Sequence, residues 1–269
     1  MKKSKFVIFL FIFLLLSFKE NDSLIIQSTT SLQDTGFYKH IINKFSLYDP
    51  VKIKVVAVGT GQAIKNSQNC DGDLLLVHHK PSEIDFIKNG YGLYRKEIMF
   101  NDYVLIGPKK GLEIFKSIKT IKDALQLIYI KKFNFVSRGD ESGTHKKEKE
   151  LWNNSGIEIN TRTDKWYFES GSGMGALLNF AVNKRAYAIT DRSTWMAFGN
   201  KRDHVIIVEN FPSLLNYYGI IPINPDQCPQ TNTVKAEKLI NWLISDIGKD
   251  IINSFRVNGK QVFFTKKNN

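Results

Sequence analysis

The stretch SRGDESGTH, residues 137–145, is the most informative part of the sequence, because the segments on either side of it differ sharply in composition. A short, mostly apolar run at 133–136 leads into it, and a Lys/Glu-rich segment at 146–152 follows it. This order predicts a strand, a tight glycine turn and a helix that opens at Ser142. A helix N-terminus exposes unpaired backbone N–H groups and carries partial positive charge, so it favours anions.

The residues at this turn suit a small tetrahedral oxyanion. Ser142 and Thr144 supply hydroxyl groups, and Gly143 allows close approach of the backbone. Arg138 adds a guanidinium group four residues upstream of Ser142. The alternative is an ordinary capped helix beside a surface arginine, since serine and threonine are common helix caps.

The same arrangement occurs twice more in the chain. A short apolar strand at 24–27 is followed by Ser28-Thr29-Thr30-Ser31 and a helical segment. A second strand, at 53–58, ends in Gly59-Thr60-Gly61, with helical sequence from Gln62. Ligands of open α/β sheets lie at the carboxyl ends of the strands. The three turns therefore predict three helix N-termini that converge on one anion.

Strand-like and helix-like segments alternate throughout, which predicts an α/β fold with mainly parallel sheets flanked by helices. Strands are expected near 24–27, 53–58, 73–78, 103–107, 133–136, 186–190, 204–208 and 217–221. Helices are expected near 33–47, 62–68, 81–89, 117–130, 143–154, 173–184, 192–199, 232–245 and 246–254.

Two segments, 102–108 and 216–222, look like strands that cross between two lobes. The predicted first lobe comprises residues 23–105 and 217–269, and the second comprises residues 106–216. Such an arrangement closes on a ligand by a hinge motion. A single domain is the alternative.

The N-terminus has the pattern of a signal peptide, which we place at residues 1–22. Lys2, Lys3 and Lys5 precede the apolar stretch 6–18, which is short for a membrane anchor. Cleavage is expected between about Phe18 and Ser23. The alternative is an anchor that is not removed.

The charge of the chain narrows the class of ligand, and its cysteines bear on a possible disulfide. The formal net charge of +12 favours anions, but the lysines are scattered and no nucleic-acid motif is present, so we expect no nucleic-acid partner. The chain has two cysteines, Cys70 and Cys228. They could pair in an oxidising compartment, but we expect two incidental thiols.

The sequence lacks signatures of catalysis and of metal binding. There is no nucleophile elbow and no nucleotide-binding glycine loop. His78 and His79 are adjacent, so on a strand they point to opposite faces and cannot share a metal. Asp191 is interpreted as a helix cap. We expect no enzymatic activity, no catalytic residue, no metal and no cofactor.

Several motifs together resemble one family. They are STTS at 28–31, VGTGQA at 58–63, DLLLVH at 73–78, NDYVLIGP at 101–108, the segment 137–147, GMGA at 173–176 and TDRST at 190–194. In this order they resemble the substrate-binding proteins of tungstate ABC importers. The resemblance implies a type II periplasmic-binding-protein fold, a periplasmic location, and a monomer that delivers tungstate or molybdate to a membrane permease. It also implies the oxyanion-binding residues, which are Thr30, Ser31, Thr60, Arg138, Ser142, Gly143 and Thr144.

The protonation state of the ligand separates the remaining alternatives. Tungstate and molybdate are bare dianions at neutral pH and can only accept hydrogen bonds, whereas phosphate still carries a proton. The proposed residues supply donors, and Asp140 and Glu141 are expected to point to solvent, so a bare oxyanion is favoured. A phosphate-binding protein and an oxyanion-ester hydrolase are the alternatives.

Overall fold

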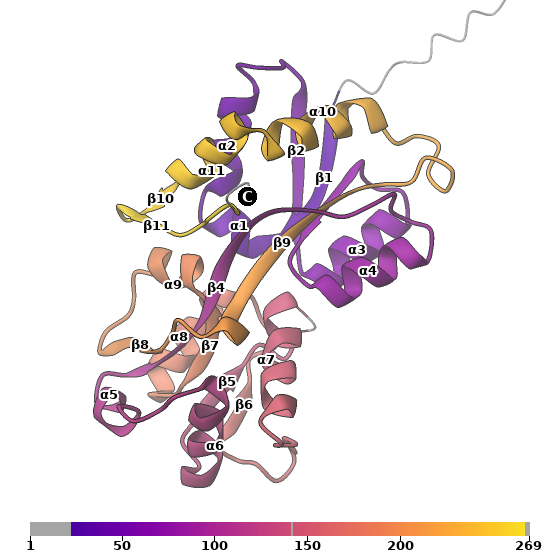
Figure 1. Ribbon diagram of the computed structural model, residues 1–269. Coiled ribbons are helices and arrows are strands. Elements are labelled where there is room, and N and C mark those ends of the chain that lie inside the picture. Colours follow the sequence, from indigo (N-terminus) through magenta and orange to yellow (C-terminus); the bar gives the residue numbers. More distant parts are fainter. Residues whose placement is uncertain (1–22, 141, 267–269) are drawn as a thin grey trace, which may run out of the picture.

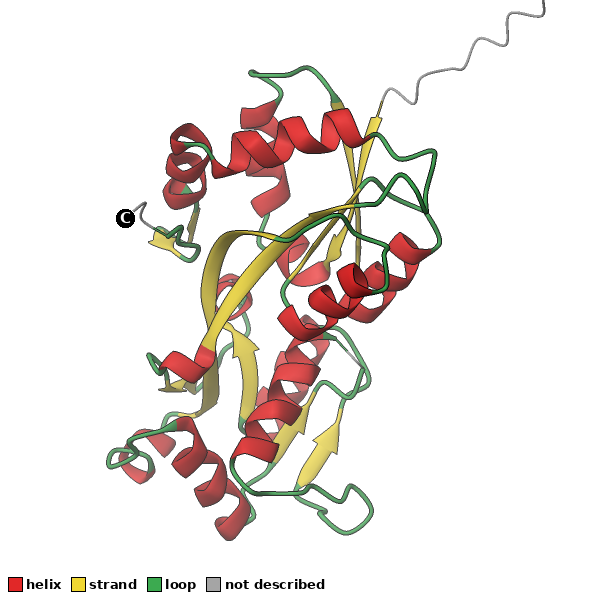
Figure 2. Ribbon diagram, turned by 45° about the vertical axis from the view of Figure 1, so that its right-hand side comes forward, coloured by secondary structure: helices red, strands yellow, loops and turns green. Residues whose placement is uncertain are grey.

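The computed structural model describes residues 23–140 and 142–266, and it consists of two lobes connected by two long strands (Figure 1). The connecting strands are β4 (Lys96–Pro108) and β9 (Leu215–Pro222). Figure 2 shows both strands running from one lobe into the other. We call the part that contains both ends of the described chain the upper lobe, and the part formed by the middle of the chain the lower lobe.

Apart from the connecting strands, each helix and strand belongs to one lobe. The upper lobe contains β1 (Ser23–Thr29), α1 (Thr30–Asp34), α2 (Phe37–Phe45), β2 (Lys52–Val58), α3 (Thr60–Gln68), β3 (Leu74–Val77), α4 (Lys80–Lys88), α10 (Thr233–Ile244), α11 (Asp246–Ser254), β10 (Arg256–Val257) and β11 (Lys260–Gln261). The lower lobe contains α5 (Gly111–Ile114), α6 (Ile121–Lys131), β5 (Phe135–Ser137), α7 (Gly143–Asn154), β6 (Tyr167–Glu169), α8 (Met174–Lys184), β7 (Ala188–Asp191), α9 (Arg192–Ala197), β8 (His204–Val208) and the 3₁₀ turn η1 (Pro212–Leu214).

A seven-stranded sheet extends through both lobes. Its order is β2-β1-β3-β9-β4-β7, and β8 also pairs with β4. β1 pairs in parallel with β2 and β3, whereas every antiparallel pair of this sheet involves β4 or β9. In the lower lobe, β5 and β6 form a separate parallel pair. Within this sheet the connecting strands therefore account for the antiparallel pairing, and the pairs of β1 are parallel, as the alternation of strands and helices predicts. Outside the sheet, β10 and β11 form a short antiparallel pair.

Backbone conformation explains where the elements differ from the predicted ones. The helix expected at 33–47 is divided into α1 and α2 by Gly36, which has a φ of +80°. This left-handed conformation suits glycine and ends a helix. β4 is much longer than the predicted strand at 103–107, because it pairs with β9 in the upper lobe as well as with β7 and β8 in the lower lobe.

The apolar cores of the two lobes are separate, and the connecting strands pass from one to the other. Met99 of β4 and Tyr218 of β9 belong to an upper-lobe core, whereas Tyr103 of β4 and Leu214 of η1 belong to a lower-lobe core. β4 therefore changes core within a few residues, and the chain does so again between η1 and β9. The predicted boundaries of the lobes, after residues 105 and 216, stay a prediction.

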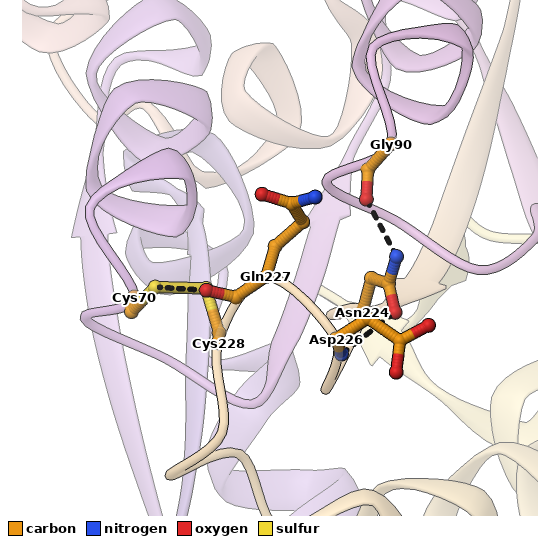
Figure 3. Close-up of a disulfide and its surroundings, with 6 residues drawn as sticks. All are labelled: Cys70, Gly90, Asn224, Asp226, Gln227 and Cys228. Atoms are coloured by element: carbon orange, nitrogen blue, oxygen red, sulfur yellow. Dashed lines mark hydrogen bonds between the residues drawn. A yellow bond between two sulfur atoms is a disulfide. The ribbon is translucent and has the colours of Figure 1, made fainter.

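Cys70 and Cys228 form a disulfide, so the expectation of two incidental thiols was wrong. The two residues are 158 positions apart in the chain, and their Cα atoms lie 5.3 Å from each other. Cys70 follows the end of α3, and Cys228 lies in the loop after β9 (Figure 3). In that loop Asn224 Nδ2 donates to the Gly90 carbonyl at 2.7 Å, which holds the loop against the turn after α4. The pairing depends on tertiary contacts, which the spacing of two cysteines does not reveal.

Within residues 23–140 and 142–266, no helix has the length and apolar character needed to cross a membrane. The predicted signal peptide, residues 1–22, lies outside the described residues, as does Glu141.

Candidate functional site

The turn at 137–145 has the predicted strand–turn–helix structure. β5 ends at Ser137 and α7 begins at Gly143, with Ser142 as its N-cap. The Ser142 hydroxyl accepts a hydrogen bond from the backbone N–H of His145 at 3.2 Å. The first residue of α7, Gly143, faces Thr60 and His78 of the upper lobe.

The N-termini of α7 and α3 meet at the boundary between the lobes. A Cβ atom on Gly143 would lie only 2.9 Å from Thr60 Oγ1 and 2.7 Å from His78 Cε1. Thr60 is the first residue of α3, and no side-chain bond caps that helix at Gly59. Thr60 Oγ1 is buried and has no hydrogen-bond partner in the described part of the chain. A buried hydroxyl without a partner costs free energy unless a ligand satisfies it.

The first turn of α1 approaches the same region from the side of the upper lobe. Ser31 is buried and lies beside the Tyr218 phenol, where it partly offsets the rise in Tyr218 pKa that burial causes. The Tyr218 ring is 5.0 Å from the His78 ring, between their centroids. Thr30 is half-buried at the first position of α1, and none of the described residues forms a hydrogen bond with its side chain. The structure therefore links Ser31 to Thr60 and Gly143 through Tyr218 and His78.

Arg138 is buried but already has an acidic partner. Its Nε donates to Asp140 Oδ2 at 3.1 Å, and its Nη2 donates to the same oxygen. The other Asp140 oxygen accepts from the Ser142 backbone N–H at 3.2 Å. Burial alone would raise the pKa of Asp140, but these bonds and the Arg138 charge lower it. The expectation that Asp140 points to solvent was therefore wrong, because Asp140 holds the guanidinium and the turn in place.

The charge of Arg138 also reaches across the boundary between the lobes. Burial and the Asp191 carboxylate raise the pKa of Asp34 in α1, and Arg138 partly offsets this rise. Asp191 is the N-cap of α9, as the sequence predicted, and accepts from the Thr194 backbone N–H at 3.0 Å. The end of α1 and the turns that begin α7 and α9 thus lie within electrostatic reach of one another.

Thr144 connects the start of α7 with the connecting strand β4. It is buried and hydrogen-bonds to Tyr103, which partly offsets the rise in Tyr103 pKa that burial and Asp191 cause. The Tyr103 hydroxyl is 3.0 Å from His78 Nδ1. Burial lowers the pKa of His78 to about 4, so this histidine is neutral at pH 7.

A buried carboxyl group supports α7 from below. Glu148 accepts from the Tyr167 hydroxyl of β6 at 2.6 Å and from Trp152 Nε1 at 3.3 Å. Burial raises the pKa of Glu148 to about 7, although the hydrogen bonds from Tyr167 and Trp152 oppose this rise. These bonds fix α7 to the strand pair β5–β6 that carries Arg138.

Sequence reasoning missed the side chains that fill the space between these turns. Four side chains fill this space, namely His78, Tyr103, Asn216 and Tyr218. From the sequence, His78 is assessed only as a possible metal ligand. Its position directly after β3 was an available signal, since Thr30 and Thr60 follow β1 and β2 in the same way. The described residues contain no group of three or more His, Cys, Asp or Glu side chains that could hold a metal ion.

Comparison with known proteins identifies the superfamily and the family of this chain. A family model described as "PBP superfamily domain" matches residues 18–246. The tungstate-binding protein TupA of Peptoclostridium acidaminophilum is 39% identical over 235 residues, which cover 87% of this chain and 81% of the relative. The chain therefore belongs to the PBP superfamily and, within it, to the family of the TupA tungstate-binding proteins.

Solved structures agree with this assignment. The tungstate ABC transporter protein from Geobacter sulfurreducens is 39% identical, with a TM-score of 0.79, and the match covers 87% of this chain and 99% of that one. TupA from Desulfovibrio alaskensis G20 is 36% identical, also with a TM-score of 0.79, over 91% of this chain and 99% of that one. The predicted two-lobe type II periplasmic-binding-protein fold and the family resemblance are confirmed.

Proposed function

We propose that this protein is the substrate-binding component of an ABC importer and that it captures tungstate between its two lobes. The structural observation that carries the proposal is the buried, unpartnered Thr60 hydroxyl at the meeting point of α3 and α7. Two helix N-termini and a hydroxyl donor form an environment that stabilises an anion. The names of the TupA relatives specify tungstate as that anion.

The proposed ligand set is the one that the resemblance implies. Thr30 and Ser31 would donate from α1, Thr60 from α3, and Arg138, Ser142, Gly143 and Thr144 from the turn before α7 and its first residues. Most of these side chains are buried at or near the boundary between the lobes, and Gly143 contributes backbone. The protein uses no catalytic residue in this function, and it needs no metal or cofactor besides the transported oxyanion.

The carboxylates near the site favour a bare oxyanion over phosphate. A protonated ligand such as phosphate benefits from an acceptor in its site, whereas a bare dianion is repelled by one. Asp191 is occupied by donors from Thr194, and Asp140 by donors from Arg138 and Ser142. Asp34 is exposed. Phosphate therefore finds no buried free acceptor among these three groups.

Calorimetric titration of the purified protein with tungstate, molybdate, sulfate and phosphate tests the proposal. We expect one tungstate per chain and much weaker binding of sulfate and phosphate. Tighter binding of phosphate than of tungstate would support the phosphate-binding alternative instead. Turnover of a phosphate or sulfate ester would support the hydrolase alternative.

The packing of Gly143 leads to a prediction about lobe closure. An added Cβ would lie 2.7 Å from His78 and 2.9 Å from Thr60, so Gly143→Ala is expected to hold the lobes apart. Overpacking of this kind typically costs about 1–3 kcal/mol, which corresponds to roughly 5- to 150-fold weaker tungstate binding. The control is Gly175→Ala in α8, whose Cβ would meet no atom within 4 Å. Equal affinities of the two variants would contradict the proposed closure at Gly143.

We further propose an extracytoplasmic, monomeric protein that releases its ligand to a membrane permease. The Cys70–Cys228 disulfide supports the location, because structural disulfides persist mainly in oxidising compartments. Protein isolated from outside the cytoplasm should begin between about Phe18 and Ser23, which N-terminal sequencing can determine. An intact Met1 on cytoplasmic protein would exclude export.

A further inference from the structure

A buried chain of hydrogen bonds links the two lobes beside the proposed oxyanion site. It begins at His78 Nδ1, which lies 3.1 Å from Asn216 Oδ1 on β9. Asn216 Nδ2 donates to Asn101 Oδ1 on β4 at 2.7 Å, and Asn101 Nδ2 donates to Asp191 Oδ1 at 3.4 Å. None of these four residues exposes more than 8% of its surface. The chain therefore connects the end of β3 in the upper lobe with the N-cap of α9 in the lower lobe.

Asp191 determines the direction of every bond in this chain. An ionised carboxylate only accepts hydrogen bonds, and Asp191 also accepts from Thr194 and from the Ser193 hydroxyl. The amide of Asn101 must therefore present its NH₂ group to Asp191 and its carbonyl to Asn216. The amide of Asn216 must then present its NH₂ group to Asn101 and its carbonyl to His78.

This order of donors and acceptors fixes the tautomer of His78. Because Asn216 offers an oxygen atom, the proton of the neutral imidazole must lie on Nδ1. The proton position of a histidine is generally set by such a hydrogen bond to one of its ring nitrogens. The Tyr103 hydroxyl is 3.0 Å from the same nitrogen, and in this tautomer its oxygen also accepts from Nδ1–H, because a protonated ring nitrogen only donates.

The orientation of the His78 ring matters because α7 packs directly against it. A Cβ on Gly143 would lie 2.7 Å from His78 Cε1 and 3.1 Å from Nδ1, so the backbone at the start of α7 lies close against the ring. We propose that Asp191, Asn101 and Asn216 are positioning residues, which hold His78 as its Nδ1–H tautomer so that the lobes can close on the oxyanion. This inference rests on the proposed function, since it assigns these residues to the closed, ligand-binding state.

Two variants interrupt the chain at different distances from His78. Asn216→Leu removes the acceptor of the Nδ1 proton. Asn101→Leu leaves His78 and its direct partners unchanged, but it frees the Asn216 amide to rotate and to present its NH₂ group to His78. We expect both variants to bind tungstate about 10- to 100-fold more weakly, by analogy with the loss seen when residues that orient metal ligands are replaced. We also expect both to shift His78 toward the Nε2–H tautomer.

The matched control is Asp102→Asn, on the next residue of β4. Asp102 accepts from Arg192 Nε at 2.7 Å and from Arg192 Nη2 at 2.6 Å, and it takes no part in the chain. This control changes a charge at the same strand, and we expect neither the tautomer nor the affinity to change. A loss of affinity in Asp102→Asn as large as in Asn101→Leu would overturn the inference.

Nitrogen-15 NMR of the His78 ring gives the tautomer directly, with calorimetry for affinity and thermal unfolding to confirm that each variant is folded. A proton on Nε2 in the unmodified protein overturns the inference without any variant. An Asn101→Leu protein that keeps both the Nδ1–H tautomer and full affinity also overturns it. The two proposals can fail separately, because a protein with the Nδ1–H tautomer that does not bind tungstate contradicts the proposed function alone.

Discussion

Arg138→Ala is expected to weaken tungstate binding by about 2–5 kcal/mol, as truncation of one partner of a buried charge pair generally does. The guanidinium is the positive charge of the proposed ligand set, and Arg138 exposes only 5% of its surface. Its removal would also leave the Asp140 carboxylate without its main partner, close to the anion. Titration calorimetry of the folded variant measures the loss.

Two further variants separate the causes of this loss. Arg138→Lys should retain part of the affinity, because it keeps the charge but not the planar fork that binds two oxygens at once. Arg162→Ala removes an exposed arginine of the same lobe and serves as the control. If Arg138→Ala bound tungstate as tightly as Arg162→Ala, Arg138 would not belong to the site.

Removal of the disulfide is expected to have the largest effect on stability. In the chain-entropy account, closing a loop of 158 residues contributes on the order of 5 kcal/mol, and measured values usually lie between about 2 and 5 kcal/mol. The double variant Cys70→Ala/Cys228→Ala should therefore unfold roughly 4–20 °C below the unmodified protein in differential scanning calorimetry.

The disulfide lies in the upper lobe between the end of α3 and the loop after β9, and neither cysteine belongs to the proposed ligand set. The affinity of the folded double variant for tungstate should therefore stay close to that of the unmodified protein. Reduction of the unmodified protein with a thiol should reproduce the lowered unfolding temperature. An unchanged unfolding temperature in both experiments would contradict a formed disulfide.

The parts of the fold that local sequence determines were predicted well. The apolar residues 74–77 form a fully buried strand, and Ser142 caps α7, because burial pattern and capping depend on near neighbours along the chain. The same applies to Asp191, whose side chain caps α9. Local signals of this kind are enough to identify an α/β fold and the turns that could bind an anion.

Features that depend on distant contacts could not be predicted from the sequence. The Arg138–Asp140 pair requires the exact shape of the turn, and the Cys70–Cys228 bond requires two loops that the fold brings together. The setting of His78 depends on Asn216, which is 138 residues away in the chain. Side chains of this kind carry no periodic pattern, so only the packed structure reveals their partners.

The position of β9 in the sheet has a consequence for how the protein is made. β9 lies between β3 and β4 in the sheet. β3 and β4 therefore each lack their partner on that side until residues 215–222 have been synthesised. Contacts between such distant segments form slowly, because a long loop has to close first. A nascent chain with this topology therefore cannot complete the sheet of its upper lobe before residues 215–222 have been made.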